Sequence, residues 1–446
     1  MKTLHLTNCW HAASGGIGTF YRALLEAANR EGHYMRLVVP GESTSVAEVG
    51  EFGRIYNIEA PRAPLDRGYR MVLPHRYLLP HTALQRIIND EKPDLIEISD
   101  KYSMPYLAGL LRTRRLPGVR LRPTVIGLSH ERMDENVAAY LTPGQAGRRF
   151  SRWFMKWLYF GMFDHHVTIS EHVAEELIRA SRGHRVRRGI WVAPMGVDCD
   201  TFTPARRSPQ GRRRLLDLVE AGEETTVLFY AGRLAPEKNP GLLLDTAARL
   251  DPEHYRLAIA GTGTLLGILK KECAARGLRH VRFPGHIPDR ETLADYYANA
   301  DIFVHPNPRE PFGIAPLEAM ASGLPLVAPN RGGVTSYANG SNAWLADDDP
   351  VSFAKAVTSV GSQVPERTRR ILAARQTAEQ HRWPLVTARY LEIYRELHAL
   401  VSSAHNGAAA LCASHTGKPA AIPARTWSTP GDLLGRELVK LQNNFL

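Results

Sequence analysis

Short runs of apolar and β-branched residues alternate along the chain with longer segments of helical periodicity. The expected helices cover residues 18–32, 240–250 and 290–300. The expected strands cover 3–7, 35–40, 94–99, 124–130, 165–170 and 190–194 in the first half, and 226–232, 255–261, 281–285, 301–306 and 324–329 in the second. Strands that alternate with helices are typical of βαβ units. The pattern therefore predicts an α/β chain with two Rossmann-like, parallel-sheet domains.

The pattern also suggests where these domains end. A loop-rich segment at 195–214 separates the two series, and the last strong helical pattern covers 383–401. From Ser402 onward Ala, Gly, Ser, Pro and Asn mix without clear periodicity, which favours a disordered or loosely attached tail. We therefore expect an N-terminal domain, a C-terminal domain, a single helix that crosses back and a tail, at residues 1–198, 199–382, 383–401 and 402–446.

Composition narrows the possible partners. Hydrophobic residues make up 44% of the chain and charged ones 23%, which is typical of a globular protein with a sizeable core. The net charge of +11 favours anionic partners: nucleic acid, an anionic membrane surface or a phosphorylated ligand. Solubility alone explains such a charge equally well. No nucleic-acid recognition motif is present, so we do not expect nucleic acid as a partner.

The cysteines and the N-terminus bear on the compartment. Cys9, Cys199, Cys273 and Cys412 form no C-x-x-C pair and lie near no spaced pair of histidines, so neither a disulfide framework nor a zinc site is indicated. The first residues are too polar for a signal peptide, and no run reaches the roughly 18 apolar residues of a membrane span. We therefore expect a cytoplasmic protein that is free of metal.

Two glutamates surround an expected helix start in REPFGIAPLEAMASGLP (309–325). Pro316 suits a first helical turn, and Gly323 suits the end of the helix. Glu310 therefore lies on the preceding loop, where Gly313 lets the backbone approach a ligand. The free N–H groups of the helix start form an anion site. Glu310 can then accept hydrogen bonds from sugar hydroxyls, and Glu318 from a ribose diol, although isolated glutamates at this spacing are usually surface charges.

Cations follow another expected strand in LFYAGRLAPEKNPG (228–241). Arg233 and Lys238 come after this strand, just before a helix. Ligands of such sheets bind at the carboxyl ends of the strands, and an Arg with a Lys suits a diphosphate. The next loop, AGTGTLLGILKK (260–271), places Gly261 and Gly263 after a strand, either for close approach to a ligand or for a plain tight turn.

The series GRLAPEKN, AIAGTG, FPGHIP and NPREPFGIAPLEAMASGLPLVAP resembles family 4 of the retaining nucleotide-sugar glycosyltransferases. This resemblance implies the GT-B fold, with two Rossmann-like domains that face a central cleft, and covers residues 3–400. It implies that Arg233 and Lys238 bind the donor diphosphate and that Glu310 binds the donor hexose. It also assigns Glu318 to the ribose and places His286 and Ile287 by the base. The backbone N–H groups near the hexose would be those of Phe312, Gly313 and Ile314.

Two stretches of the first half carry further candidates. Gly15, Gly16 and Gly18 follow the first strand and allow a phosphate or sugar to approach, but Tyr21 replaces the third glycine of a dinucleotide fingerprint. His130 ends a strand; alone it would be a structural residue, whereas the family resemblance implies contact with the donor hexose. Asp100 is expected at a strand end as an acceptor or sugar contact.

SDKYS (99–103) and SHERMDE (129–135) resemble a subgroup of GDP-mannose-dependent α-mannosyltransferases that act on glycolipids. The segment 147–163 combines four cations with seven aromatic residues. This composition is typical either of a surface that rests on anionic lipid or of a buried helix with a basic flank.

We therefore expect a retaining, metal-independent hexosyltransferase that needs no cofactor. Its donor would be a nucleotide diphosphate sugar, first GDP-mannose and second a UDP-hexose, and its acceptor a glycolipid or glycan. Catalysis would depend on His130, Glu310, Arg233 and Lys238. An epimerase, a phosphorylase and a non-catalytic nucleotide-sugar-binding protein are the alternatives; the last would bind donor without turnover.

Overall fold

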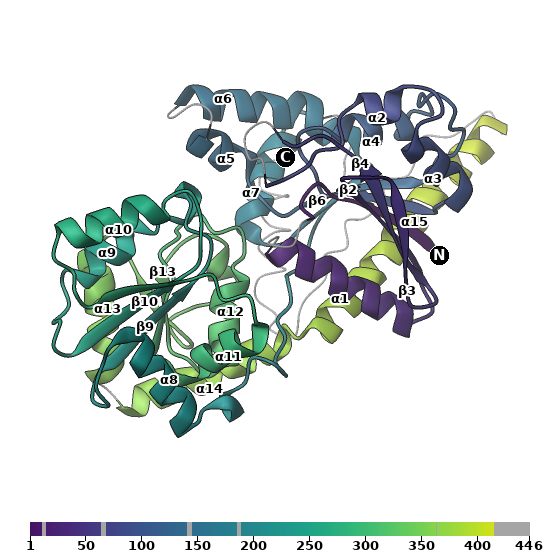
Figure 1. The fold of residues 1–446 in the computed structure, drawn as a ribbon. Helices are drawn as coiled ribbons and strands as arrows, with labels where there is room; N and C mark the ends of the chain where they lie inside the picture. Colours follow the sequence, from purple (N-terminus) through teal and green to yellow (C-terminus); the bar gives the residue numbers. More distant parts are fainter. Residues whose placement is uncertain (11–14, 64–67, 141–144, 185–188, 363, 414–446) are drawn as a thin grey trace.

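A computed structural model describes residues 1–446 except 11–14, 64–67, 141–144, 185–188, 363 and 414–446. Figure 1 shows two α/β domains, each built around one sheet. The sequence pattern had predicted this arrangement, with strands at each of the eleven expected places.

The N-terminal sheet has the order β3-β4-β2-β1-β5-β6-β7-β8, in which every pairing is parallel except β3 with β4. Its strands are β1 (Lys2–Leu6), β2 (Tyr34–Gly41), β3 (Ser45–Val49), β4 (Gly53–Glu59), β5 (Leu95–Ile98), β6 (Thr124–Ser129), β7 (His165–Thr168) and β8 (Ile190–Val192). The hairpin β3–β4 was not predicted. Every residue of β3 from Ser45 to Glu48 is exposed, so this edge strand has no apolar face to reveal it.

Helices cover both faces of this sheet. They are α1 (Gly16–Arg30), α2 (His75–Leu78), α3 (Ala83–Glu91), α4 (Pro105–Arg112), α5 (Met133–Tyr140), α6 (Gln145–Phe154) and α7 (Glu171–Ser181). A π-helical turn, η1 (Met155–Tyr159), and a 3-10 turn, η2 (Phe160–Met162), continue α6. Tyr159 and Phe160 of these turns, and Phe163 directly after them, are fully buried.

The C-terminal sheet is entirely parallel, with the order β11-β10-β9-β12-β13-β14. Its strands are β9 (Thr226–Ala231), β10 (Tyr255–Ala260), β11 (Val281–Gly285), β12 (Ile302–Val304), β13 (Leu326–Pro329) and β14 (Trp344–Ala346). The helices are α8 (Pro209–Val219), α9 (Gly241–Ala247), α10 (Leu266–Ala275), α11 (Arg290–Asn299), α12 (Ile314–Ala321), α13 (Pro350–Ser362) and α14 (Val364–Gln380).

Helix α15 (Trp383–Ala413) runs from the C-terminal domain back onto the N-terminal one (Figure 1). Tyr394 donates a hydrogen bond to the buried Glu97 of β5, and Tyr390 donates to the carbonyl of Ala193. The helix continues beyond the expected range 383–401, as far as Ala413, and the loose attachment expected from Ser402 stays a prediction. Residues 414–446 lie outside the described ones.

Candidate active site

Glu310 lies in the loop between β12 and α12, where the side chains of Lys238 and Asn307 hold its carboxylate. Lys238 Nζ lies 2.9 Å from both carboxylate oxygens, and Asn307 Nδ2 donates to Oε2 over 2.9 Å. Burial would raise the pKa of Glu310, but Lys238, His305 and these hydrogen bonds together lower it to about 2. Glu310 is therefore a buried carboxylate that stays ionised at neutral pH.

His305 lies on the other side of Glu310, with Nε2 3.7 Å from Oε2. Burial lowers the pKa of His305 to about 4, so the imidazole is neutral at pH 7 and Lys238 supplies the counter-charge. The sequence analysis missed His305 and Asn307. The available signal was their position, because both are polar residues directly after a buried strand, in the run HPNP.

Lys238 comes from the 3-10 turn η4 (Pro236–Lys238), which follows β9. The next residue, Asn239, adopts a left-handed conformation (φ 52°) and donates from Nδ2 to the carbonyl of Pro306 over 3.2 Å. This bond ties the turn after β9 to the loop after β12. Two strands that neighbour each other in the sheet thus bring Lys238 and Glu310 together at their carboxyl ends.

Helix α12 begins at Ile314, four residues after Glu310, so Glu310 lies on the preceding loop as the sequence predicted. Gly313 precedes it with φ 94°, a conformation that other residues rarely adopt. The Tyr337 hydroxyl donates to the Gly313 carbonyl, and Phe312 packs with ring centroids 5.0 Å from Tyr337. Among the residues that the structure describes, no side chain caps this helix. The N–H groups of its first turn are therefore available to an anion, next to Glu310.

Glu318, on α12, has a raised pKa, in contrast to the lowered pKa of Glu310. Burial raises the pKa of Glu318 to about 7, although Arg290, 3.9 Å from Oε1, lowers it. Glu318 thus changes charge near neutral pH, whereas Glu310 stays ionised.

Arg233 follows β9 and lies close to the N-terminal domain. Its side chain is 47% exposed and pairs with Glu237 at 2.9 Å. Burial, followed by the charges of Glu131 and Asp100, raises the pKa of Cys9 well above its ordinary value, and Arg233 opposes this shift. Arg233 is therefore near enough to Cys9, in the other domain, to act on its thiol.

His130 directly follows β6, next to Cys9 of the N-terminal domain. Its Nε2 lies 3.7 Å from Cys9 Sγ, and its buried Nδ1 has no hydrogen-bond partner among the described residues. Burial lowers the pKa of His130, so a neutral imidazole carries an unsatisfied nitrogen here. Cys9 and His130 thus lie side by side in the N-terminal domain, and the charge of Arg233 acts on Cys9 from the other domain.

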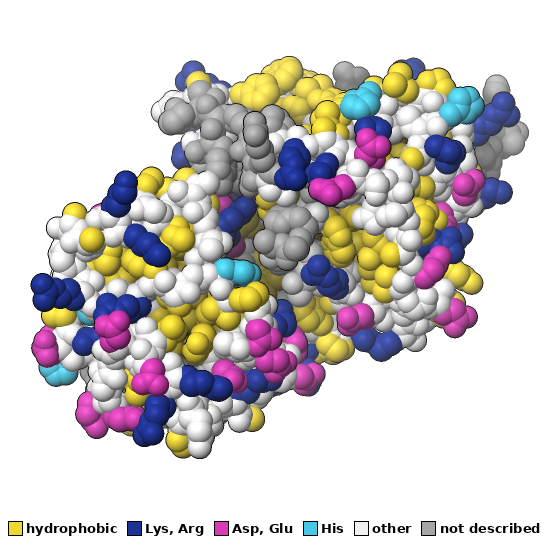
Figure 2. Space-filling model, in the orientation of Figure 1, with side chains coloured by type: hydrophobic (Ala, Val, Ile, Leu, Met, Phe, Trp, Pro, Cys, Tyr) yellow, Lys and Arg dark blue, Asp and Glu magenta, His cyan; other side chains and the backbone are white. Residues whose placement is uncertain are grey.

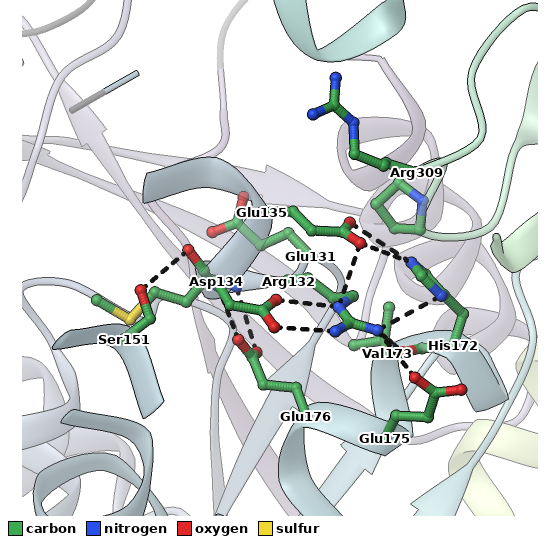
Figure 3. Close-up of polar contacts among 12 residues, drawn as sticks. Glu131, Arg132, Asp134, Glu135, Ser151, His172, Val173, Glu175, Glu176 and Arg309 are labelled. Carbon is green, nitrogen blue, oxygen red and sulfur yellow. Dashed lines mark hydrogen bonds and ion pairs between the residues drawn. The ribbon is translucent and has the colours of Figure 1, made fainter. Parts of the chain in front are cut away.

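A buried ionic cluster, which the sequence analysis did not predict, holds the segment that carries His130 (Figure 3). Arg132 binds Asp134 through two hydrogen bonds of 3.0 and 2.9 Å and reaches Glu175 at 3.1 Å. Glu176 of α7 accepts from the N–H groups of Met133 and Asp134, over 3.2 and 2.9 Å, and therefore caps α5.

Lys101 completes this cluster. It is almost fully buried, with Nζ 2.7 Å from Glu176, and it also donates to the carbonyl of Glu131. Arg309, from the loop that carries Glu310, lies above Glu135 in Figure 3. At the start of α7 the Ser170 hydroxyl donates to the carbonyl of Pro311. One helix thus connects the Glu310 loop with the loop of His130.

The predicted glycines have different surroundings. Gly16 opens α1, and a Cβ there would lie 2.8 Å from Ile314 Cδ1, which places the first loop against the start of α12. Gly15 is exposed, whereas Gly18 is buried within α1. Cβ atoms at Gly261 and Gly263 would lie 1.9 and 2.3 Å from the carbonyls of Gly232 and Leu234. These last two glycines therefore serve loop packing, whether or not a ligand binds.

Asp100, His286 and Ile287 remain predictions as ligand contacts. Asp100 Oδ2 accepts from the N–H groups of Tyr102, Ser103 and Met104, over 3.1, 2.6 and 2.8 Å, immediately before α4. That oxygen is thus used within the fold. His286 is exposed and Ile287 half-buried, in the loop after β11.

Family models match both halves of the chain. Residues 14–201 match "Glycosyltransferase Family 4", and residues 217–377 match "Glycosyl transferases group 1". The chain is 31% identical over 393 residues to a GDP-mannose-dependent alpha-(1-6)-phosphatidylinositol dimannoside mannosyltransferase of Mycobacterium tuberculosis, an alignment that covers 88% of this chain and 95% of that protein.

Solved structures share the fold. The sucrose-phosphate synthase of Thermosynechococcus elongatus matches with a TM-score of 0.71 and 19% identity, over 90% of this chain and all of that one. Anabaena Alr3699/HepE in complex with UDP and glucose matches with a TM-score of 0.64 and 17% identity, over 89% of this chain and all of that one. The fold is GT-B, as expected, and the chain is a glycosyltransferase that belongs to family 4.

Proposed function

We propose that this enzyme transfers a hexose from a nucleotide diphosphate sugar to a hydroxyl group of a glycolipid or glycan, with retention of the anomeric configuration and without a metal. The contact between Lys238 and Glu310 carries this proposal, because it sets a cation and a carboxylate beside the uncapped start of α12. A diphosphate with an attached sugar needs those three features.

The proposed donor position follows from these groups. The diphosphate lies against the N–H groups at the start of α12, with Arg233 and Lys238 beside it. An ammonium has three N–H donors, and Glu310 occupies two of them on Lys238, so the third serves a phosphate oxygen. Glu310 accepts from hexose hydroxyls, and Glu318 accepts from the ribose.

The chemistry then needs little from acid or base side chains. The acceptor oxygen forms a bond to the anomeric carbon on the face from which the bond to the phosphate oxygen breaks, and the acceptor proton passes to that phosphate oxygen. Arg233, Lys238 and the α12 N–H groups stabilise the charge that develops on the leaving diphosphate, which is the role a metal ion fills in other transferases. Neutral His130 contacts the hexose from the other domain.

GDP-mannose is the first candidate donor, since the name of the Mycobacterium tuberculosis relative describes that enzyme as GDP-mannose-dependent. A UDP-hexose is the second, since the Anabaena structure contains UDP and glucose. We place the enzyme on the cytoplasmic face of a membrane, with a lipid-linked acceptor. Cys9, Cys199 and Cys273 are unpaired within the described residues, which is consistent with a reducing compartment.

A panel of nucleotide sugars tests this function. At a hundredfold excess over its Kd, the true donor stabilises the fold by about 2.7 kcal/mol and is slowly hydrolysed without acceptor. Lys238→Ala abolishes both responses, whereas Lys270→Ala, at an exposed lysine of the same domain, keeps them. Stabilisation without hydrolysis or transfer would favour the non-catalytic binding protein. No response to any nucleotide sugar would contradict the proposal.

A further inference from the structure

Helix α6 and the turn η1 present aromatic side chains to solvent. Phe150, Trp153 and Trp157 are 52%, 51% and 62% exposed. Their spacing of three and four residues places them on one face of the helix. The side of the helix that faces the protein is buried through Gly147, Ser151, Phe154 and Met155. The fold itself therefore needs no aromatic residues on the outer face.

Basic residues run beside this aromatic stripe. Arg148, Arg149 and Arg152 are exposed, and Lys156 Nζ lies 5.1 Å from the centre of the Trp157 ring. Residues 145–162 contain no Asp or Glu, and within the described residues no acidic side chain pairs with these three arginines. Figure 2 shows hydrophobic side chains gathered at the upper edge of the molecule, where Figure 1 places α6.

We propose that this outer face, Arg148–Trp157, docks the enzyme on the headgroup region of an anionic lipid bilayer. Tryptophan and phenylalanine rings insert at that depth while arginine and lysine pair with lipid phosphates. Within the described part of the chain no helix is long and apolar enough to cross a bilayer. The docking is peripheral.

The surroundings favour a bilayer over a nucleic-acid strand. Single-stranded nucleic acid binds in basic grooves with aromatic platforms, whereas these residues lie on the outside of one helix. Leu78 and Leu79, 41% and 57% exposed, lie at α2, which Figure 1 shows at the same upper edge of the domain. Exposed leucines offer nothing to a nucleobase, but they insert readily into lipid.

The docking face also lies near the candidate site. Helix α6 packs on α5, and α5 in turn contacts the turn η4 that ends with Lys238. The segment of His130 precedes α5. A bilayer on α6 therefore places the hydroxyl of a lipid-linked acceptor one helix away from the proposed donor position. Only this link to the acceptor rests on the proposed function.

Flotation of the full chain with lipid vesicles tests the docking face. The enzyme binds vesicles that contain phosphatidylglycerol at least about tenfold more strongly than vesicles of phosphatidylcholine alone, and salt at about 0.5 M weakens this binding. Replacement of Trp153 and Trp157 by Ala, or of the three arginines by Ala, lowers the affinity at least about tenfold. These side chains are exposed, so the fold survives their loss.

The matched control removes three positive charges from a surface far from α6 in the sequence. Arg213, Lys270 and Lys271 are exposed in the C-terminal domain, and their replacement by Ala leaves vesicle binding unchanged. Equal loss in this control, or equal binding to both vesicle types, would overturn the proposal. So would tighter binding to a single-stranded oligonucleotide, or a dimer that Trp153→Ala/Trp157→Ala dissociates without any vesicle binding. Stabilisation by nucleotide sugar is measured separately in each variant; if that fails while vesicle binding persists, only the proposed function is wrong.

Discussion

Lys238 and Glu310 lie 72 residues apart in the sequence, yet the lysine ammonium is 2.9 Å from each oxygen of the carboxylate. The two residues follow β9 and β12, which are neighbours in the C-terminal sheet. Glu310 is buried, and Lys238 makes the largest of the contributions that keep its carboxylate ionised.

Removal of Lys238 leaves a buried carboxylate without its counter-charge. We expect Lys238→Met to lower the free energy of unfolding by about 3–5 kcal/mol, and Lys238→Met/Glu310→Gln to recover much of that loss. Urea denaturation measures both. Arg331→Met, which breaks an exposed ion pair with Asp348, serves as control and costs at most about 1 kcal/mol. Similar costs for Lys238→Met and Arg331→Met would contradict this account.

Glu318 makes stability depend on pH in the opposite sense to most carboxylates. Its pKa is raised from 4.5 to about 7, so the folded state prefers the protonated form. Its contribution to stability is complete below pH 4.5 and is lost as pH rises through 7, by up to about 3 kcal/mol. Glu318→Gln should therefore stabilise the protein at pH 8 and change little at pH 4.5. Equal effects at both pH values would refute the raised pKa.

The raised pKa of Glu318 also leads to a prediction of how the affinity for the donor changes with pH. In the proposed donor position an ionised Glu318 would accept two hydrogen bonds from the ribose diol, so the Kd of the donor should fall as pH rises from 6 to 8. Calorimetric titration measures this change. In Glu318→Gln the slope should vanish; an unchanged slope would assign the pH dependence to another group.

Gly313 should tolerate no side chain. Its φ of 94° is unfavourable for alanine, and a Cβ would lie 3.0 Å from the Tyr337 hydroxyl. We expect Gly313→Ala to cost about 1–3 kcal/mol in thermal unfolding and to weaken donor binding. Gly267, with free space at its Cβ and within α10, is the control, and Gly267→Ala should be neutral or slightly stabilising. A neutral Gly313→Ala would show that the start of α12 is not held in this conformation.

Glu176 should position His130 from a distance. Glu176→Gln weakens the cap on α5 and removes the ion pair of Lys101, so we expect kcat to fall at least about tenfold while the KM for the donor stays the same. Glu253, exposed in the C-terminal domain, is the control, and Glu253→Gln should change neither constant. A rise in donor KM with unchanged kcat would contradict the positioning role.

The sequence pattern predicted those strands and helices whose buried residues form a continuous or periodic apolar run. The central strands were found because they are continuous apolar runs. The edge strand β3 is exposed and therefore leaves no apolar run; β14, an edge strand of the other sheet, was missed as well. The end of α15 was missed because HNGAAALCA has good helix formers but no apolar periodicity.

Some residues of the candidate site could be predicted from the sequence, and others could not. Arg233, Lys238 and Glu310 could be predicted as candidates because polar residues after strands lie at one edge of a parallel sheet, and the structure brings Lys238 and Glu310 into contact. The ionic cluster of Arg132 joins residues that are about forty positions apart, and no local pattern encodes such pairing. Asp100 was assigned to a ligand, but its position just before α4 also fits the cap that Oδ2 forms.

A crystal structure with an intact, slowly reacting nucleotide sugar tests the central claim most directly. The account predicts diphosphate oxygens at about 3 Å from Lys238 Nζ, the Arg233 guanidinium and an N–H group at the start of α12, with Glu310 at the hexose hydroxyls. A diphosphate bound elsewhere, with Lys238 and Glu310 still paired only to each other, would contradict it.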